Sequence, residues 1–230
     1  MRRELQVWFR LRHSTIVPLL GIAYVESPLP ALVSQWMPLG TLDIYLEKQA
    51  TALTASTKVA LAKSIADGLI YLHSENVVHG DLQPPQINVL VDSSGNPRLT
   101  GFGIATVVGD PELQLATTTA DRSFDSRWRA PELIGVDCDP ETPTFESDVY
   151  SFGSVMFYII SGDIPWKEKK RSHQISIELS RGATPARPEN ILNDRWNLIQ
   201  RCWSWNPGDR PLAARIIEYI DQSRNDDSQV

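Results

Sequence analysis

The sequence predicts an α+β fold, in which a small front part with one helix and a few strands precedes a mostly helical body. Three observations predict it. Short β-type runs occur only in the first hundred residues, and helical periodicity dominates the rest. The segment 149–160 is apolar around its whole circumference, which predicts a helix inside a core. With 230 residues, 42% of them hydrophobic, the chain can bury one substantial core.

The front part is predicted to contain one helix and two strands. Apolar residues recur at helical spacing over residues 4–11, so a helix opens the chain. Residues 16–21 and 31–36 have the composition of short strands, with a turn between them. Thr41 follows a glycine and precedes an amphipathic run, so its hydroxyl is predicted to cap the next helix by accepting from freed backbone amides.

The body is predicted to begin with a long helix over residues 57–73. Its buried stripe consists of Leu61, Ile65, Leu69 and Leu72. Residues 89–91 and 97–99 flank an Asp-Ser-Ser-Gly-Asn turn, which predicts a hairpin. Residues 101–131 lack steady periodicity and are predicted to form a long loop.

Three further helices are predicted in the second half of the chain. The apolar helix over 149–160 is expected to end at Gly162, because glycine accommodates the left-handed conformation after a helix. Amphipathic helices follow over 195–203 and 212–220. The polar end, residues 221–230, is expected to be a disordered tail.

The composition argues against several classes of function. The net charge is −6 and the acidic residues are spread along the chain, so nothing drives binding to nucleic acid or anionic lipid. No cationic leader opens the chain, and the most apolar run, 155–160, is too short to cross a bilayer. Cys138 and Cys202 lie far apart without metal-ligand spacing, as is typical of a reducing compartment. We therefore expect a soluble cytoplasmic protein.

Three short motifs occur in a fixed order along the body. They are His-Gly-Asp at 79–81, Gly-Phe-Gly at 101–103 and Ala-Pro-Glu at 130–132. In that order they resemble the catalytic loop, the metal loop and the Ala-Pro-Glu segment of eukaryotic protein kinases. The run 127–132 and the pair 202–203 look most like the tyrosine-kinase-like group.

The resemblance implies a protein-kinase-like fold with a truncated upper lobe and a mostly helical lower lobe. The domain is expected to span 1–220, with an upper-lobe remnant at 1–37, from the regulatory helix to the hinge, and the lower lobe at 38–220. Glu4 would be the helix glutamate that pairs with a strand lysine in active kinases. That lysine and the Gly-rich loop should lie upstream, so we expect either a fragment or a gene that lost them.

The resemblance assigns catalytic roles to the first loop. Asp81 would accept or orient the proton of the attacking hydroxyl, and Asn88 would be the magnesium-binding amide. Asn88 lies seven positions after Asp81, where the family pattern places five, so residues within 84–87 must bulge or Asn88 is displaced. Gln83 replaces the lysine that contacts the transferred phosphate and brings no charge. Asp81 as a loop aspartate bonded to backbone amides, and Asn88 as a loop-capping amide, are the favoured alternatives.

Gly101 stands where the family places its metal-binding aspartate. A glycine has no donor atom, so the resemblance implies weak ATP binding, little or no Mg²⁺ binding, and a rate lower by roughly a thousandfold or more. Leu90 would form the floor of the adenine pocket. Its hinge would be lined by Ser34, Gln35 and Met37.

Other matches imply structural roles. Glu132 and Arg210 would form a buried ion pair, and Asp148 would hold the catalytic-loop backbone. An apolar spine between the lobes would contain Trp8, Leu19, His79 and Phe102.

Three functions remain open at this point. The chain is expected to be a pseudokinase that binds a protein partner in intracellular signalling. It could instead be an active kinase whose missing motifs reflect a faulty gene model. A decayed paralogue without a present role is the third alternative.

Overall fold

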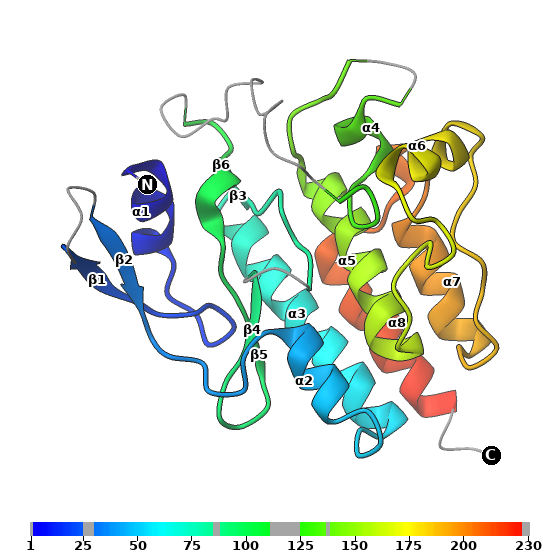
Figure 1. The fold of residues 1–230 in the computed structure, drawn as a ribbon, viewed down its shortest axis with the longest axis horizontal. Helices are drawn as coiled ribbons and strands as arrows, with labels where there is room; N and C mark the ends of the chain where they lie inside the picture. Colours follow the sequence, from blue (N-terminus) through cyan, green and yellow to red (C-terminus); the bar gives the residue numbers. More distant parts are fainter. Residues whose placement is uncertain (1, 25–29, 85–87, 111–124, 137–138, 227–230) are drawn as a thin grey trace.

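The computed structural model describes residues 2–24, 30–84, 88–110, 125–136 and 139–226. The helices in these ranges are α1 (Arg2–Arg10), α2 (Leu42–Lys48), α3 (Ala55–Ser74), α4 (Pro131–Ile134), α5 (Phe145–Ser161), α6 (Ser172–Ser180), α7 (Asn193–Cys202) and α8 (Ala213–Asp226), with short 3-10 turns η1 (Phe102–Ile104) and η2 (Pro207–Asp209). The strands are β1 (Leu19–Ala23), β2 (Ala31–Ser34), β3 (Val77–Val78), β4 (Val89–Val91), β5 (Pro97–Leu99) and β6 (Thr106–Val107). Figure 1 shows α1, β1 and β2 at one end and a helical body at the other, with β3 to β6 between them next to α3. This is an α+β arrangement, as the sequence predicts.

The strands form three antiparallel pairs: β1 with β2, β3 with β6, and β4 with β5. Strand β1 starts three residues later than predicted. The reason is that the Val17 N–H donates to Leu99 O (2.9 Å), and Ile16 also bridges to Leu99. This short segment is thereby tied to the β4–β5 hairpin before the chain turns into β1.

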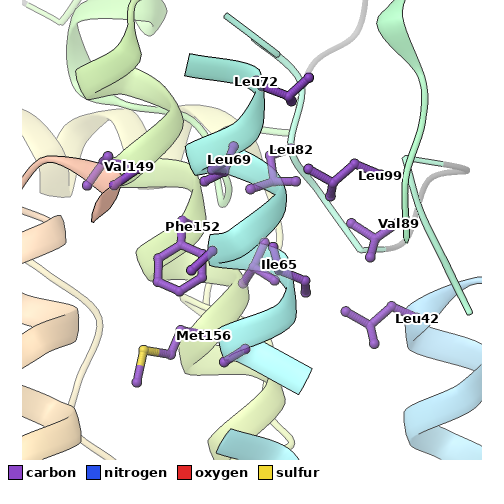
Figure 2. Packing of buried hydrophobic residues seen from close by; sticks show 14 of the residues in the cluster. Leu42, Ile65, Leu69, Leu72, Leu82, Val89, Leu99, Val149, Phe152 and Met156 are labelled. Atoms are coloured by element: carbon purple, nitrogen blue, oxygen red, sulfur yellow. The ribbon is translucent and has the colours of Figure 1, made fainter. Parts of the chain in front are cut away.

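The core of the body is the contact between α3 and α5. Helix α3 packs against α5 and α8 on one side and β5 on another, while α5 also packs against α7. The predicted stripe Leu61, Ile65, Leu69 and Leu72 is buried. Figure 2 shows Phe152 and Met156 of α5 on one side of α3, and Val89 and Leu99 of the hairpin on the other.

Helix α5 is buried along almost its whole length, as its uniform apolarity predicts. It begins with a capping box, in which Thr144 Oγ1 accepts from the Ser147 N–H (3.2 Å) and Ser147 Oγ accepts from the Thr144 N–H (2.9 Å). It ends at Gly162, whose φ of 80° is left-handed and therefore suits glycine. In the described part of the chain no helix is both long and apolar enough to cross a membrane.

Three sequence predictions need correction. Thr41 does precede α2, but its hydroxyl donates to the Asp43 carboxylate and caps no backbone amide. The predicted loop 101–131 contains η1 and β6, and it ends where α4 begins. Strand β6 forms because Thr106 and Val107 pair with β3. Residues 111–124 of this loop lie outside the described ranges. Helix α8 continues to Asp226, so only 227–230 of the predicted tail lie outside the described residues.

Leu69→Ala should lower the free energy of unfolding by about 2–5 kcal/mol, because it opens a cavity between α3 and α5. Leu69 is 0% exposed. Urea denaturation measures the loss. Leu212→Ala is the matched control: this leucine is 70% exposed, and its truncation should change stability by less than about 0.5 kcal/mol. Equal losses in the two variants would contradict the assignment of the core.

Candidate functional site

The loop that carries Asp81 is hydrogen-bonded to a buried carboxylate on α5. Asp148, 1% exposed, accepts the backbone N–H of His79 (2.8 Å) and of Gly80 (2.8 Å). His73 Nε2 at the end of α3 lies 3.1 Å from the same carboxylate. Two elements of the core thus fix the backbone immediately before Asp81, in the arrangement that the sequence implies for Asp148.

His79 joins this loop to the next one. The Asp81 N–H donates to Nδ1 (3.2 Å), so Nδ1 is an acceptor and the ring proton is on Nε2, which donates to Thr100 O (2.9 Å). The ring packs against Phe102, with centroids 5.5 Å apart. His79 is 0% exposed and both nitrogens are engaged, so it has the contacts of a packed core histidine.

Side-chain amides hold the Asp81 carboxylate on both oxygens. Gln83 Nε2 donates to Oδ1 (2.6 Å), and Asn88 Nδ2 donates to Oδ2 (2.9 Å) and to the Asp81 carbonyl (2.7 Å). Among the described residues, these donors are side-chain amides, whereas the alternative expected backbone amides. Gln83 and Asn88 are buried while Asp81 is half-buried, so this amide–carboxylate cluster is largely shielded from water.

Asn88 reaches Asp81 despite the long spacing between them. Of the residues 84–87, within which the bulge is predicted, 85–87 lie outside the described residues. Because Nδ2 is directed at Asp81, Oδ1 is directed at Gly101. This oxygen is the atom that a metal-binding asparagine would offer to the cation.

Gly101 leaves no room for a side chain. Its φ of +81° is left-handed, and a Cβ placed on it would overlap Asn88 Oδ1 and lie 2.6 Å from Asn88 Cγ. Gly80, at the arginine of the family motif, is similar: its φ is +76°, and a Cβ there would lie 3.1 Å from both Cβ and Cγ of Pro143. A side chain at position 101 would therefore displace Asn88, whereas one at position 80 would need only a small shift of Pro143.

The residues present do not fit a magnesium ion at this site. Asn88 and Asp81 are bonded to each other, and Gly101 supplies no carboxylate. No group of three or more His, Cys, Asp or Glu side chains within the described ranges is arranged to hold a metal. A cation here would first have to separate Asn88 from Asp81.

Arg129 is a site residue that sequence reasoning missed. Burial lowers the pKa of its guanidinium, and the negative charge of Asp81 opposes that effect. The arginine therefore brings a positive charge into the surroundings of the Asp81 carboxylate. Its position in the sequence could have indicated this role, because Arg129 directly precedes Ala130 and Pro131, which are buried. A charged residue next to buried residues needs a partner of opposite charge.

The residues assigned to an adenine pocket lie on two connected segments. Ser34 ends β2, Gln35 donates its N–H to Pro18 O (2.9 Å), and Met37 is buried. Leu90, half-buried in β4, bridges to Thr41 just after that hinge.

Two other residues near the front of the chain differ in exposure. Trp36, in the hinge, is 83% exposed. Glu4 is half-buried on α1.

The predicted spine and ion pair are both present as contacts. Trp8 packs on Phe102 with centroids 5.8 Å apart, and Phe102 packs on His79. Leu19, the fourth predicted member, is buried in the large core cluster that also contains Trp8 and Phe102. Arg210 binds Glu132 through two bonds, Nη1 to Oε1 (2.6 Å) and Nη2 to Oε2 (2.9 Å). Arg210 also donates to the carbonyls of Glu146, Ser204 and Trp205.

Comparison with known proteins agrees with this arrangement. Residues 1–220 match the family model described as protein tyrosine and serine/threonine kinase. The chain is 28% identical over 220 residues to serine/threonine-protein kinase STY46 of Arabidopsis thaliana, covering 96% of this chain and 36% of that protein. It is 27% identical over 226 residues to the Raf homolog serine/threonine-protein kinase of Caenorhabditis elegans, covering 95% of this chain and 27% of that one. The chain thus spans about a third or less of the length of these relatives.

Gly101→Ala should destabilise the protein more than Gly109→Ala, by about 1–3 kcal/mol in unfolding free energy. Both glycines have a similar left-handed φ (+81° and +85°), but a Cβ on Gly109 meets nothing within 4 Å. The difference therefore measures the cost of turning Asn88 away from Asp81. In an Asn88→Ala background the difference should vanish, and its persistence there would contradict the proposed contact.

Arg210→Leu should lower the unfolding free energy by roughly 3–5 kcal/mol, because it leaves the Glu132 carboxylate buried without its partner. Adding Glu132→Leu should recover part of this loss, since no unpaired charge is then buried. Arg215→Leu is the control: its ion pair with Glu218 is solvent-exposed and should contribute less than about 1 kcal/mol. Chemical denaturation of the four proteins compares them, and a larger loss in the double variant than in Arg210→Leu would refute the explanation.

Proposed function

Because the chain belongs to the protein tyrosine and serine/threonine kinase family, we propose that it is a pseudokinase of the tyrosine-kinase-like group. In this proposal phosphoryl transfer from ATP to protein hydroxyls is absent or very weak. The chain acts instead as a protein-binding module in intracellular, cytoplasmic signalling. The observation that carries the proposal is the closed cluster of Gln83, Asn88 and Asp81 against Gly101.

The missing carboxylate matters because phosphoryl transfer depends on charge neutralisation. In this family metal ions bridge the outer phosphates and offset the charge that develops in the transition state. Gly101 has no side chain with which to hold them. Losing about 4 kcal/mol of such stabilisation lowers the rate roughly a thousandfold. Gln83, where the family has a lysine, adds no compensating positive charge.

The Asp81 carboxylate is oriented by its neighbours. Each of its oxygens accepts one amide N–H, from Gln83 at 2.6 Å and from Asn88 at 2.9 Å. A carboxylate oxygen has two lone pairs, so these two bonds do not by themselves exclude an incoming hydroxyl. The proposed loss of phosphoryl transfer therefore rests on the missing metal ligand at Gly101.

A protein partner is proposed because the helical body keeps the family's structural contacts although it lacks the metal-binding carboxylate at position 101. The bidentate Glu132–Arg210 pair and the Asp148 anchor hold the segments that surround the site. Such a body can present a fixed surface to another protein. The net charge of −6 disfavours nucleic acid and anionic membranes as the partner.

An active serine/threonine kinase is the second candidate. Asp81 is retained, and the similar proteins from Arabidopsis thaliana and Caenorhabditis elegans are named serine/threonine kinases. ATP with Mg²⁺ would then bind between the hinge at Ser34–Met37 and Asn88, and Asn88 would have to release Asp81.

A phosphotransfer assay with ATP, Mg²⁺ and a general protein substrate separates the two candidates. We expect turnover at least a thousandfold below that of an ordinary kinase domain, unchanged by Asp81→Asn. Thermal unfolding with ATP, with and without Mg²⁺, should show little stabilisation and no dependence on the metal. Turnover within tenfold of ordinary kinases that Asp81→Asn abolishes would establish the active kinase instead.

A further inference from the structure

Positive charge gathers on a segment of the helical body although the net charge of the chain is negative. Residues 163–187 contain six Lys or Arg and three Asp or Glu, which is a net charge of +3. The whole chain carries −6, so the residues outside this segment carry −9. The segment consists of the loop after α5, helix α6 and part of the loop before α7, and we call it the basic segment. Figure 1 shows α6 and α7 at the end of the molecule opposite α1.

Three cations of the basic segment are available to an anionic partner. Lys170, Arg171 and Arg187 are exposed, and among the described residues no carboxylate lies within ion-pair distance of them. Gln174 Oε1 accepts the backbone N–H of Lys170 (3.1 Å) and of Arg171 (3.2 Å), which fixes where both side chains start. Two other lysines of the segment are already neutralised, in the pairs Lys167–Asp163 (2.6 Å) and Lys169–Glu178 (2.7 Å).

An arginine from another part of the chain anchors the loop before α6. Arg127 Nη1 donates to Pro165 O (3.0 Å) and Trp166 O (2.6 Å), and its Nη2 donates to Lys169 O. Trp166 is 5% exposed and packs with apolar residues of α6 in a small cluster. Its φ of 57° is left-handed, which is uncommon for a residue with a side chain and requires such support. An anchored loop loses less conformational entropy on binding than a free one.

A small hollow adjoins the anchored loop. It has a volume of about 130 Å³ and lies between the end of α5 and the loops on either side of α6, with walls that include Ile164, Trp166 and Pro188. A cavity of about 150 Å³ can hold a benzene ring, so this hollow has room for one aliphatic side chain. The Lys169 N–H donates to Trp166 O (2.8 Å), and this turn connects the wall of the hollow to Lys170.

An acidic protein segment fits this surface better than a nucleic acid does. Asp163, Glu168 and Glu178 stand among the cations of the basic segment, and the rest of the chain is strongly acidic. A long polyanion would meet this negative charge, whereas a short segment with a few carboxylates would contact the cations alone. The hollow, with its apolar walls, also suits the side chain of an aliphatic residue.

We propose that the basic segment binds an acidic stretch of a partner protein, with carboxylates on Lys170 and Arg171 and one aliphatic side chain in the hollow, which Arg187 also lines. The inference adds a surface and a class of partner to the protein-binding role proposed above, and it rests on that role. Binding at this surface does not require phosphoryl transfer.

The probe is a fluorophore-labelled, end-blocked peptide of sequence Glu-Asp-Leu-Glu-Asp-Glu, and fluorescence anisotropy measures its binding to the full chain. We expect a dissociation constant on the order of 0.1 mM at about 50 mM salt. Binding should weaken roughly threefold at about 500 mM salt, because salt screens exposed charge pairs. The same peptide with Gln and Asn in place of its acidic residues should bind roughly tenfold more weakly. Replacing its leucine by serine should weaken binding roughly threefold, because the hollow then stays empty.

Variants of the basic segment locate the binding site. Lys170→Gln combined with Arg171→Gln should weaken binding of the acidic peptide roughly five- to tenfold. Arg10→Gln combined with Lys48→Gln removes the same charge from exposed positions outside the segment and should change binding less than about twofold. Ala186→Trp places a large side chain at an exposed position of the hollow. In that variant the leucine and serine peptides should bind equally, while thermal unfolding remains cooperative.

The proposal is overturned if the acidic peptide fails to bind at millimolar concentration, or if the two pairs of substitutions weaken its binding equally. A preference for leucine over serine that persists in Ala186→Trp would overturn the place given to the aliphatic side chain. Tighter binding of an oligothymidylate of equal charge would make the basic segment a polyanion site instead. Phosphotransfer is measured in a separate assay, so a failure of peptide binding would leave the proposed loss of phosphoryl transfer standing.

Discussion

The candidate site depends on the buried carboxylate of Asp148. It lies inside the core helix α5, and it accepts two consecutive backbone amides from the loop before Asp81. Buried charges are tolerated when several donors surround them, and His79, Gly80 and His73 all supply contacts here. The packing between α3 and α5 is thereby coupled to the position of Asp81.

Above this anchor, the two glycines of the motifs show how the fold accommodates lost side chains. Gly80 and Gly101 both have a left-handed φ. Because neither has a side chain, a neighbouring side chain can approach its Cα closely. Pro143 packs at one and Asn88 at the other. At Gly101 this contact turns the Asn88 amide toward Asp81. The loss of a carboxylate at one position and the restraint of the carboxylate at another therefore have a single geometric origin.

Sequence periodicity predicted the elements that bury much apolar surface. Helix α3 begins two residues and α5 four residues before the predicted start, and each ends one residue after the predicted end. It missed α6, a nine-residue helix that contributes only Ile175 and Leu179 to a small separate cluster. It also missed β3 and β6, which are two residues each and exist because distant segments meet. Short elements stabilised by a partner far along the chain leave no periodic signal.

By itself, the sequence determined the order of motifs, the family resemblance and the identity of the site residues, because these depend on which side chains occur and at what spacing. It also showed that position 101 has no side chain with which to bind a cation, since that follows from the identity of the residue. Only the tertiary structure decided what replaces the missing group. The bond from Asn88 to Asp81 crosses an irregular loop, and the charge of Arg129 near Asp81 comes from a residue far along the chain. Such contacts arise from packing in three dimensions, which no local pattern encodes.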